Sequence, residues 1–154
     1  MSITYSFHVA TEHTPEDVRR LLRVAPDGAL RDAYGAGQPA HVLVKPLGGD
    51  PVERALFQSA YGFAPTVAVT VELSKDSDDE EVQEGPAVEI MRTLLGQLGS
   101  DVYASYLGDY PVLVRRRGVL VVDSRWVGQR PWFRGVLGVD YEVRDLVDPY
   151  SEPV

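Results

Sequence analysis

Three histidines and a run of carboxylates are the residues of this sequence that could build acid–base or metal chemistry. The histidines are His8, His13 and His41. None of them has a second histidine or a carboxylate at an established metal-ligand spacing. We therefore interpret all three as surface polar residues and expect neither a metal nor a cofactor. Carboxylates that lie far apart in the sequence can still meet a histidine after folding, so an enzyme with a carboxylate–histidine site is kept as an alternative hypothesis.

The carboxylates gather in a run that spans residues 76–84. This run lacks the ordered ligand spacing and the central glycine of a calcium-binding loop. Acidic runs are usually solvated, and they can also present negative charge to a lysine- or arginine-rich protein. The candidate partner-binding acids are Asp76, Asp78, Asp79, Glu80, Glu81 and Glu84.

Two tryptophans in the last third of the chain are the second set of candidate partner-binding residues. Trp126 and Trp132 lie close to Phe133 in a segment without clear periodicity. Aromatic side chains often anchor protein interfaces, but here we favour the interpretation that they cap one end of the core. A further alternative is a small-ligand sensor, in which Trp126, Trp132 and Tyr141 line a cavity between sheet and helices.

Motifs of the common enzyme classes are missing from the sequence. There is no cysteine, which excludes a thiol nucleophile, a disulfide framework and a cysteine-based zinc site. The glycines at 35–37 and 48–49 lack dinucleotide or P-loop spacing, and no serine lies in Gly-x-Ser-x-Gly. Three consecutive arginines, 115–117, lie at a predicted hairpin tip, where we expect them to pair with nearby acids or to protect the turn from edge pairing. We therefore interpret the chain as non-catalytic.

The formal net charge of −8 restricts the class of partner. Nucleic acid and anionic membrane surfaces both require a basic footprint, which an acidic chain lacks. A basic protein would suit the charge, because opposite fields accelerate association. The N-terminal residues show no secretory signal, and no window approaches the ~18 apolar residues of a membrane span. We therefore expect a cytoplasmic protein.

Periodicity predicts an alternation of strands and helices along the chain. Residues 3–10 alternate between apolar and polar side chains, which is typical of a half-buried strand. Thr14 can cap a helix that has Pro15 at its first position. Strands are predicted over 3–10, 41–45, 66–73, 102–107, 110–115, 119–123 and 139–144, and helices over 14–24, 51–61 and 86–98.

This order of elements predicts an α+β fold. One-sided alternation favours a mostly antiparallel sheet with two or three helices packed on one face. The 154 residues fit one domain, and no internal repeat or linker divides them. We expect a single domain over residues 1–147 and a loose tail over 148–154, while the oligomeric state is left open.

Several of these segments together resemble a known protein family. The resemblance extends over about residues 3–126 and rests on a strand opening, a helix cap, a strand entry and a hairpin. The matching stretches are 5–11, 14–18, 62–69, 90–95, 100–101, 113–116 and 118–120. They resemble the third class of Sit immunity proteins, bacterial antidotes to polymorphic toxins of the swarming-inhibition type. The resemblance implies a cytoplasmic protein that binds a cognate toxin and blocks it, and it assigns no individual functional residue.

Overall fold

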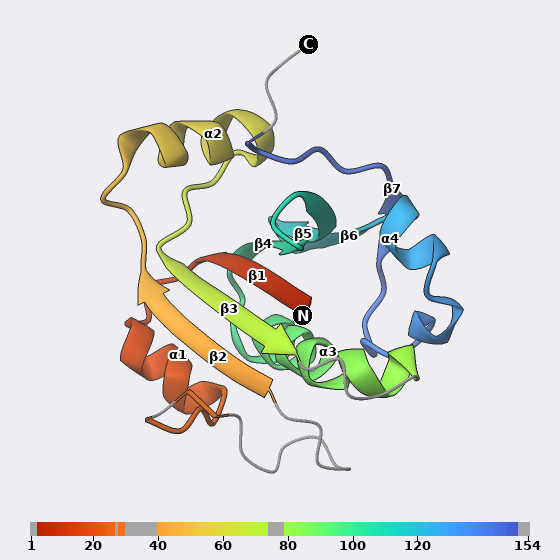
Figure 1. Ribbon diagram of the computed structural model, residues 1–154. Helices are drawn as coiled ribbons and strands as arrows, with labels where there is room; N and C mark the ends of the chain where they lie inside the picture. Colours follow the sequence, from red (N-terminus) through yellow and green to blue (C-terminus); the bar gives the residue numbers. More distant parts are fainter. Residues whose placement is uncertain (1–2, 27, 30–39, 74–78, 151–154) are drawn as a thin grey trace.

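A seven-stranded sheet organises the computed structural model, which describes residues 3–26, 28–29, 40–73 and 79–150 (Figure 1). The strand order is β2-β3-β1-β4-β5-β6-β7, and all neighbours are antiparallel except β6 and β7. The strands are β1 (Ile3–Ala10), β2 (Ala40–Pro46), β3 (Val67–Leu73), β4 (Asp101–Tyr106), β5 (Tyr110–Arg116), β6 (Val119–Asp123) and β7 (Glu142–Arg144).

Helices cover both faces of this sheet. They are α1 (Pro15–Leu21), α2 (Pro51–Tyr61), α3 (Glu80–Gln97) and α4 (Ser124–Gly128), with a short 3₁₀ turn over Pro131–Phe133. Helices α1, α3 and α4 pack on one face, whereas α2 lies on the other (Figure 1). The predicted α+β fold with a mostly antiparallel sheet is confirmed. The helix predicted over 51–61 is present as α2, but it packs on the second face and not on the face that the other helices share.

The main core lies between the sheet and α1, α3 and α4. Ile3, Tyr5, Phe7 and Val9 of β1 point into it and are at most 5% exposed, which confirms the alternation read from the sequence. A smaller core on the second face joins Phe57 and Tyr61 of α2 to side chains of β4, β5 and β6. The central strands are therefore covered on both sides, and this explains their continuous apolar runs.

Two tight turns join β4, β5 and β6. Leu107 and Gly108 have φ values of 55° and 82°, and Arg117 and Gly118 have φ values of 52° and 81°. The β5–β6 turn has two residues, Arg117 and Gly118, and positive φ at both matches the right-handed twist of such a hairpin. The β4–β5 turn has three residues between the paired Tyr106 and Tyr110, and Gly108 adopts its positive φ without steric strain. The two predicted hairpins are confirmed.

Helix α3 begins at Glu80, six residues before the predicted start at Pro86. Asp79 caps the helix, because its carboxylate accepts the backbone N–H groups of Glu81 and Val82 at 3.0 and 3.4 Å. Acidic residues in the first turn also suit the positive end of the helix dipole. The predicted start at Pro86 was wrong, because Gly85 and Pro86 usually mark a helix boundary but here lie within α3.

The last predicted strand is shortened to Glu142–Arg144. It pairs in parallel with β6 at the edge of the sheet, where Val139 and Val143 are 48% and 51% exposed. Apolar–polar alternation over 139–144 therefore does not lead to burial of these two valines at the sheet edge. Beyond β7, the Tyr61 hydroxyl accepts the backbone N–H of Val147 at 3.0 Å and donates to its carbonyl oxygen. Of the tail predicted as loose, residues 148–150 are described, and Tyr150 contacts α2 through Glu53.

Consecutive arginines of β5 hold helices on opposite faces of the sheet. The Arg115 guanidinium donates to the carbonyl oxygens of Leu95 at 2.7 Å and Ser100 at 2.7–2.9 Å, and also to that of Leu98. Arg116 points the other way and donates to the carbonyl oxygen of Tyr61, the last residue of α2, at 3.1 Å. Carbonyls at a helix C-terminus have no partner within the helix, and cations there suit the dipole. The arginines that we expected to serve acids or guard a turn therefore cap α3 and α2.

We expect Arg115→Ala to lower the free energy of unfolding by about 2 kcal/mol, because the carbonyls at the end of α3 lose a charged donor. Arg92→Ala is the matched control, since the Arg92 side chain is 48% exposed and its guanidinium pairs with Glu89 one turn away. We expect this control to change stability by about 0.5 kcal/mol. Urea unfolding followed by circular dichroism measures both values, and equal effects of the two substitutions would contradict the capping role.

Candidate functional site

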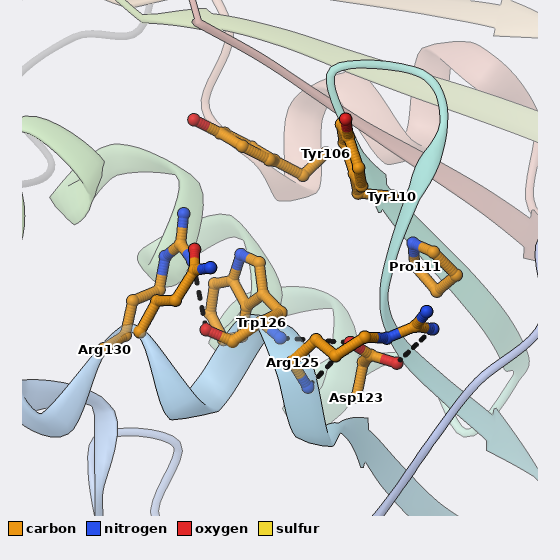
Figure 2. A pocket seen from close by; sticks show the side chains of 8 residues that line it. Tyr106, Tyr110, Pro111, Asp123, Arg125, Trp126 and Arg130 are labelled. Carbon is orange, nitrogen blue, oxygen red and sulfur yellow. Dashed lines mark hydrogen bonds and ion pairs between the residues drawn. The ribbon is translucent and has the colours of Figure 1, made fainter.

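An aromatic cleft of about 460 Å³ opens where the β4–β5 hairpin meets α4. Figure 2 shows the rings of Tyr106 and Tyr110 on one side of it and Trp126, Arg125 and Arg130 on the other. Tyr110 is 60% exposed, whereas Trp126 is 4% exposed and forms part of the core. The lining residues of this aromatic cleft are Tyr106, Tyr110, Pro111, Asp123, Arg125, Trp126, Gln129 and Arg130.

Asp123 positions the α4 side of the cleft. Its carboxylate caps α4 by accepting the backbone N–H groups of Arg125 and Trp126 at 3.1 and 3.0 Å. It also accepts the backbone N–H of Leu146 at 2.9 Å and the Arg125 guanidinium at 3.2 Å (Figure 2). A buried carboxylate that accepts this many hydrogen bonds is fully satisfied. Asp123 therefore has a structural role in fixing Arg125 and Trp126.

A buried ion pair between Arg130 and Glu84 closes the inner end of the cleft. Two N–H groups of the Arg130 guanidinium donate to the two Glu84 carboxylate oxygens at 2.8 and 3.0 Å. A third donates to the carbonyl oxygen of Trp126 at 3.0 Å, and the guanidinium lies 4.6 Å from the Trp126 ring centroid. Burial acts to lower the pKa of Arg130, but the hydrogen bonds and charge of Glu84 outweigh it and raise the pKa. Arg130 therefore keeps its charge and joins α3 to α4.

The predicted acidic residues separate into three groups. Asp76 and Asp78 lie outside the described residues, and Asp79, Glu80 and Glu81 are exposed at the start of α3. Glu84 is 1% exposed, so it is not part of the negative surface that we expected over the whole run. Helical spacing places Glu80 and Glu84 on the same side of α3, where they lie 3.4 and 2.8 Å from Arg130. Glu84 is the buried member of this pair of acids. Glu84 therefore supplies the negative charge that balances the buried guanidinium of Arg130.

The two predicted tryptophans face different hollows. Trp126 lines the aromatic cleft, whereas Trp132 lines a shallow hollow of about 320 Å³ that also contains Glu81 and Glu89 of α3. Phe133 lies between them, with ring centroids 4.7 Å from Trp126 and 6.0 Å from Trp132. The Phe133 ring occupies the space between these tryptophans, and its centroid lies 6.2 Å from that of Tyr141. The prediction that these rings cap one end of the core agrees with this packing.

His8 is not the solvated surface residue that we expected. Its side chain is 13% exposed, and its Nε2 atom lies 3.8 Å from Glu53 Oε1 and 3.4 Å from the Tyr150 hydroxyl. The Tyr150 hydroxyl donates to Glu53 at 2.7 Å, while His8 Nδ1 and the Tyr103 hydroxyl are buried without a hydrogen-bond partner. The sequence placed His8 on a polar strand face and gave no signal that α2 and Tyr150 cover it. His13 and His41 are exposed, as predicted.

His8 is the most buried member of the His8–Glu53–Tyr150 cluster, whereas Tyr150 is 44% exposed. His8 lines neither the aromatic cleft nor the Trp132 hollow, and the Phe57 ring covers it at a centroid distance of 5.0 Å. In the part of the chain that the structure describes, no group of three or more histidine and acidic side chains could hold a metal ion. A search of the same residues finds no helix that is long and apolar enough to cross a membrane.

The fold and the cleft together define an α+β protein with an aromatic cleft beside an acidic helix start. A family model described as SitI3-like matches residues 3–131, which is most of the chain. The protein therefore belongs to the SitI3-like family, and the resemblance found in the sequence motifs is confirmed. No curated protein and no solved structure matches the chain.

We expect Arg130→Met to lower the free energy of unfolding by about 3–5 kcal/mol, because Glu84 then stays buried without its partner. The double variant Arg130→Met/Glu84→Leu removes both charges and should recover most of that loss. Urea unfolding of the wild type, both single variants and the double variant completes the cycle. If the double variant were as unstable as the sum of the single variants, the two side chains would not be coupled.

We expect stability to fall with acidification below about pH 6.5, in part because of His8. Burial lowers the pKa of His8, partly offset by Glu53, and Lys45 lowers it further. The unfolded chain therefore takes up a proton near pH 6.5, and the folded chain takes it up only at lower pH, so unfolding becomes easier in that window. His8→Gln should reduce this dependence, as measured by thermal unfolding between pH 5 and 8, while His13→Gln should preserve it. An unchanged pH profile in His8→Gln would contradict the buried state.

Proposed function

We propose that this chain is an immunity protein that binds a cognate protein toxin and blocks it without catalysing a reaction. The observation that carries this proposal is membership of the SitI3-like family over residues 3–131. The site chemistry supports it, since His8 is mostly buried under Phe57 and the buried carboxylates of Glu84 and Asp123 are engaged in structural contacts. A toxin antidote of this kind would act in the cytoplasm.

Charge supports a basic toxin as the partner. The chain has 23 acidic and 15 basic side chains, which give the formal net charge of −8. Many proteins that act on nucleic acid are themselves basic, and opposite fields steer such partners together. The same charge disfavours direct contact of this chain with nucleic acid or with an anionic membrane.

We further propose that the toxin contacts an acidic–aromatic surface, made of Asp79, Glu80 and Glu81 together with the aromatic cleft. Glu80 lies 3.4 Å from Arg130, which lines the cleft, so the acidic helix start and the cleft adjoin each other. The exposed Tyr110 ring supplies apolar area beside the charges. Aromatic anchors surrounded by complementary charge are the usual composition of tight interfaces. The predicted partner-binding residues Trp126 and Trp132 would then act by shaping this surface and the adjoining hollow.

The direct test is rescue by co-expression. Cells that produce the toxin encoded beside this gene should grow when this chain is co-expressed, and the two purified proteins should form a 1:1 complex. Failure of the wild-type chain to rescue growth, together with no complex on size-exclusion chromatography, would reject the proposed function.

We expect Glu80→Gln/Glu81→Gln to weaken toxin binding about tenfold and to flatten its salt dependence, because steering charge is lost. Tyr110→Ala, which removes an exposed ring, should also weaken binding by about tenfold or more. Glu12→Gln/Asp140→Gln is the matched control, since both acids are exposed and lie away from the cleft. Calorimetry at two salt concentrations measures the affinities. Wild-type affinity in the first two variants would exclude this surface while leaving the proposed function in place.

A further inference from the structure

A second groove of about 420 Å³ lies on the sheet face that α2 covers. It runs between the end of α2, the β5–β6 hairpin and the segment around β7. Its floor is apolar, with Val114, Val121 and Leu146 each at most 9% exposed. We call it the arginine groove, because Arg116, Arg117 and Arg144 line it.

The charge of the arginine groove opposes the charge of the whole chain. Three arginines and a single acid, Asp145, line the groove in a chain that has more acidic than basic side chains. Arg144 pairs with Glu142, and the Asp145 carboxylate accepts the Ser124 hydroxyl. Because Arg144 is paired and the Asp145 carboxylate keeps its charge, the local excess of positive charge comes from Arg116 and Arg117 and is partly offset by Asp145.

Most guanidinium N–H donors of Arg116 and Arg117 have no hydrogen-bond partner among the residues that the structure describes. Arg116 and Arg117 are exposed, and neither guanidinium forms an ion pair with any residue that the structure describes. The Arg116 guanidinium donates to the carbonyl oxygen of Tyr61, so four of the five N–H donors that a guanidinium carries have no assigned partner. Arg115, by contrast, places its guanidinium on the carbonyls that end α3. Two consecutive arginines, of which Arg116 spends one donor on Tyr61, thus line an apolar floor.

We propose that the arginine groove binds an acidic segment of a partner polypeptide. Carboxylates of the segment pair with Arg116 and Arg117, and an adjacent aliphatic side chain rests on Val114 and Val121. Guanidinium groups match carboxylates in a two-pronged geometry, which makes these pairs stronger and more directional than contacts of a point charge. The apolar floor suits an aliphatic side chain, and the net charge of −8 disfavours the long polyanion of a nucleic acid.

This inference goes beyond the proposed function and does not depend on it. The arginine groove and the aromatic cleft have no lining residue in common. The acids Asp79, Glu80 and Glu81 beside the aromatic cleft do not line the arginine groove, which has three arginines and one acid. The acidic segment can therefore belong to a different partner from the one that contacts the aromatic cleft.

The test selects binders from a library of short random peptides displayed on phage, using the full chain as bait. We expect enriched peptides to carry at least two acidic residues next to an aliphatic one. Fluorescence anisotropy then compares their affinity for the wild type and for Arg116→Gln/Arg117→Asn. Asparagine tolerates the positive φ of Arg117 and precedes Gly118 as in favoured hairpin turns. We expect the double variant to bind at least about tenfold more weakly.

Two control variants separate this site from general charge effects. Arg20→Gln/Arg23→Asn removes the same charge from exposed positions, and Arg23 also has a positive φ, of 58°. We expect it to keep wild-type affinity for the peptides. Arg116→Lys/Arg117→Lys keeps the charge but loses the two-pronged geometry, so it should bind with intermediate affinity. Thermal unfolding verifies that each variant is folded.

Three results would overturn the proposal. The first is a selection that enriches no acidic peptides. The second is equal binding of the enriched peptides to the wild type and to Arg116→Gln/Arg117→Asn. The third is binding of a single-stranded oligonucleotide through Arg116 and Arg117 at concentrations where the acidic peptides do not bind, which would assign the groove to a phosphate backbone instead.

Discussion

The buried pair of Arg130 and Glu84 is the interaction on which the described site depends. Arg130 would be too costly to bury without an opposite charge, and Glu84 supplies that charge from the interior side of α3. The same guanidinium holds the carbonyl oxygen of Trp126 and lies against its ring, so one cation sets the distance between α3 and α4. The exposed acids at the start of α3 are therefore held at a fixed place beside the aromatic cleft. A buried contact thus fixes the position of these acids, while their side chains are exposed to solvent.

Much of the sheet could be predicted from the sequence because its signals are local. Alternation in β1 and β3, the Thr14 cap of α1 and the glycines of the two hairpins each act over a few residues, and each is present where it was expected. The start of α3 and the length of β7 were missed for a different reason. Asp79 and Gly85 are both plausible helix boundaries in the sequence, and only Asp79 caps α3. The burial of a strand at the sheet edge depends on the elements that cover it, and periodicity alone does not predict those elements.

The candidate site shows the same limit more clearly. The sequence offered the acidic run and Trp126 as candidates, but it gave no reason to separate Glu84 from Glu80. Both lie near Arg130, and only the burial of Glu84 against Arg130, 46 residues away, distinguishes them. The covering of His8 by Phe57 and Tyr150 is likewise a long-range event. An i, i+4 pair of acids at a helix start, followed later by a single arginine among aromatic residues, is the only sequence signal that could have suggested the buried pair. The arginine groove could not be predicted because three consecutive arginines look alike in the sequence, whereas Arg115 reaches α3 on one face and Arg116 and Arg117 line the groove on the other.

The opposite directions of Arg115 and Arg116 give β5 a role as a two-sided brace. Successive residues of a strand point to opposite faces, so a slip of β5 by a single residue would exchange the two side chains and release both helix ends at once. A shift in the register of β5 would therefore cost hydrogen bonds on both faces of the sheet. Only one register lets Arg115 and Arg116 reach the ends of α3 and α2 together. Helices that never touch each other can in this way lose their order in the same step when the chain opens.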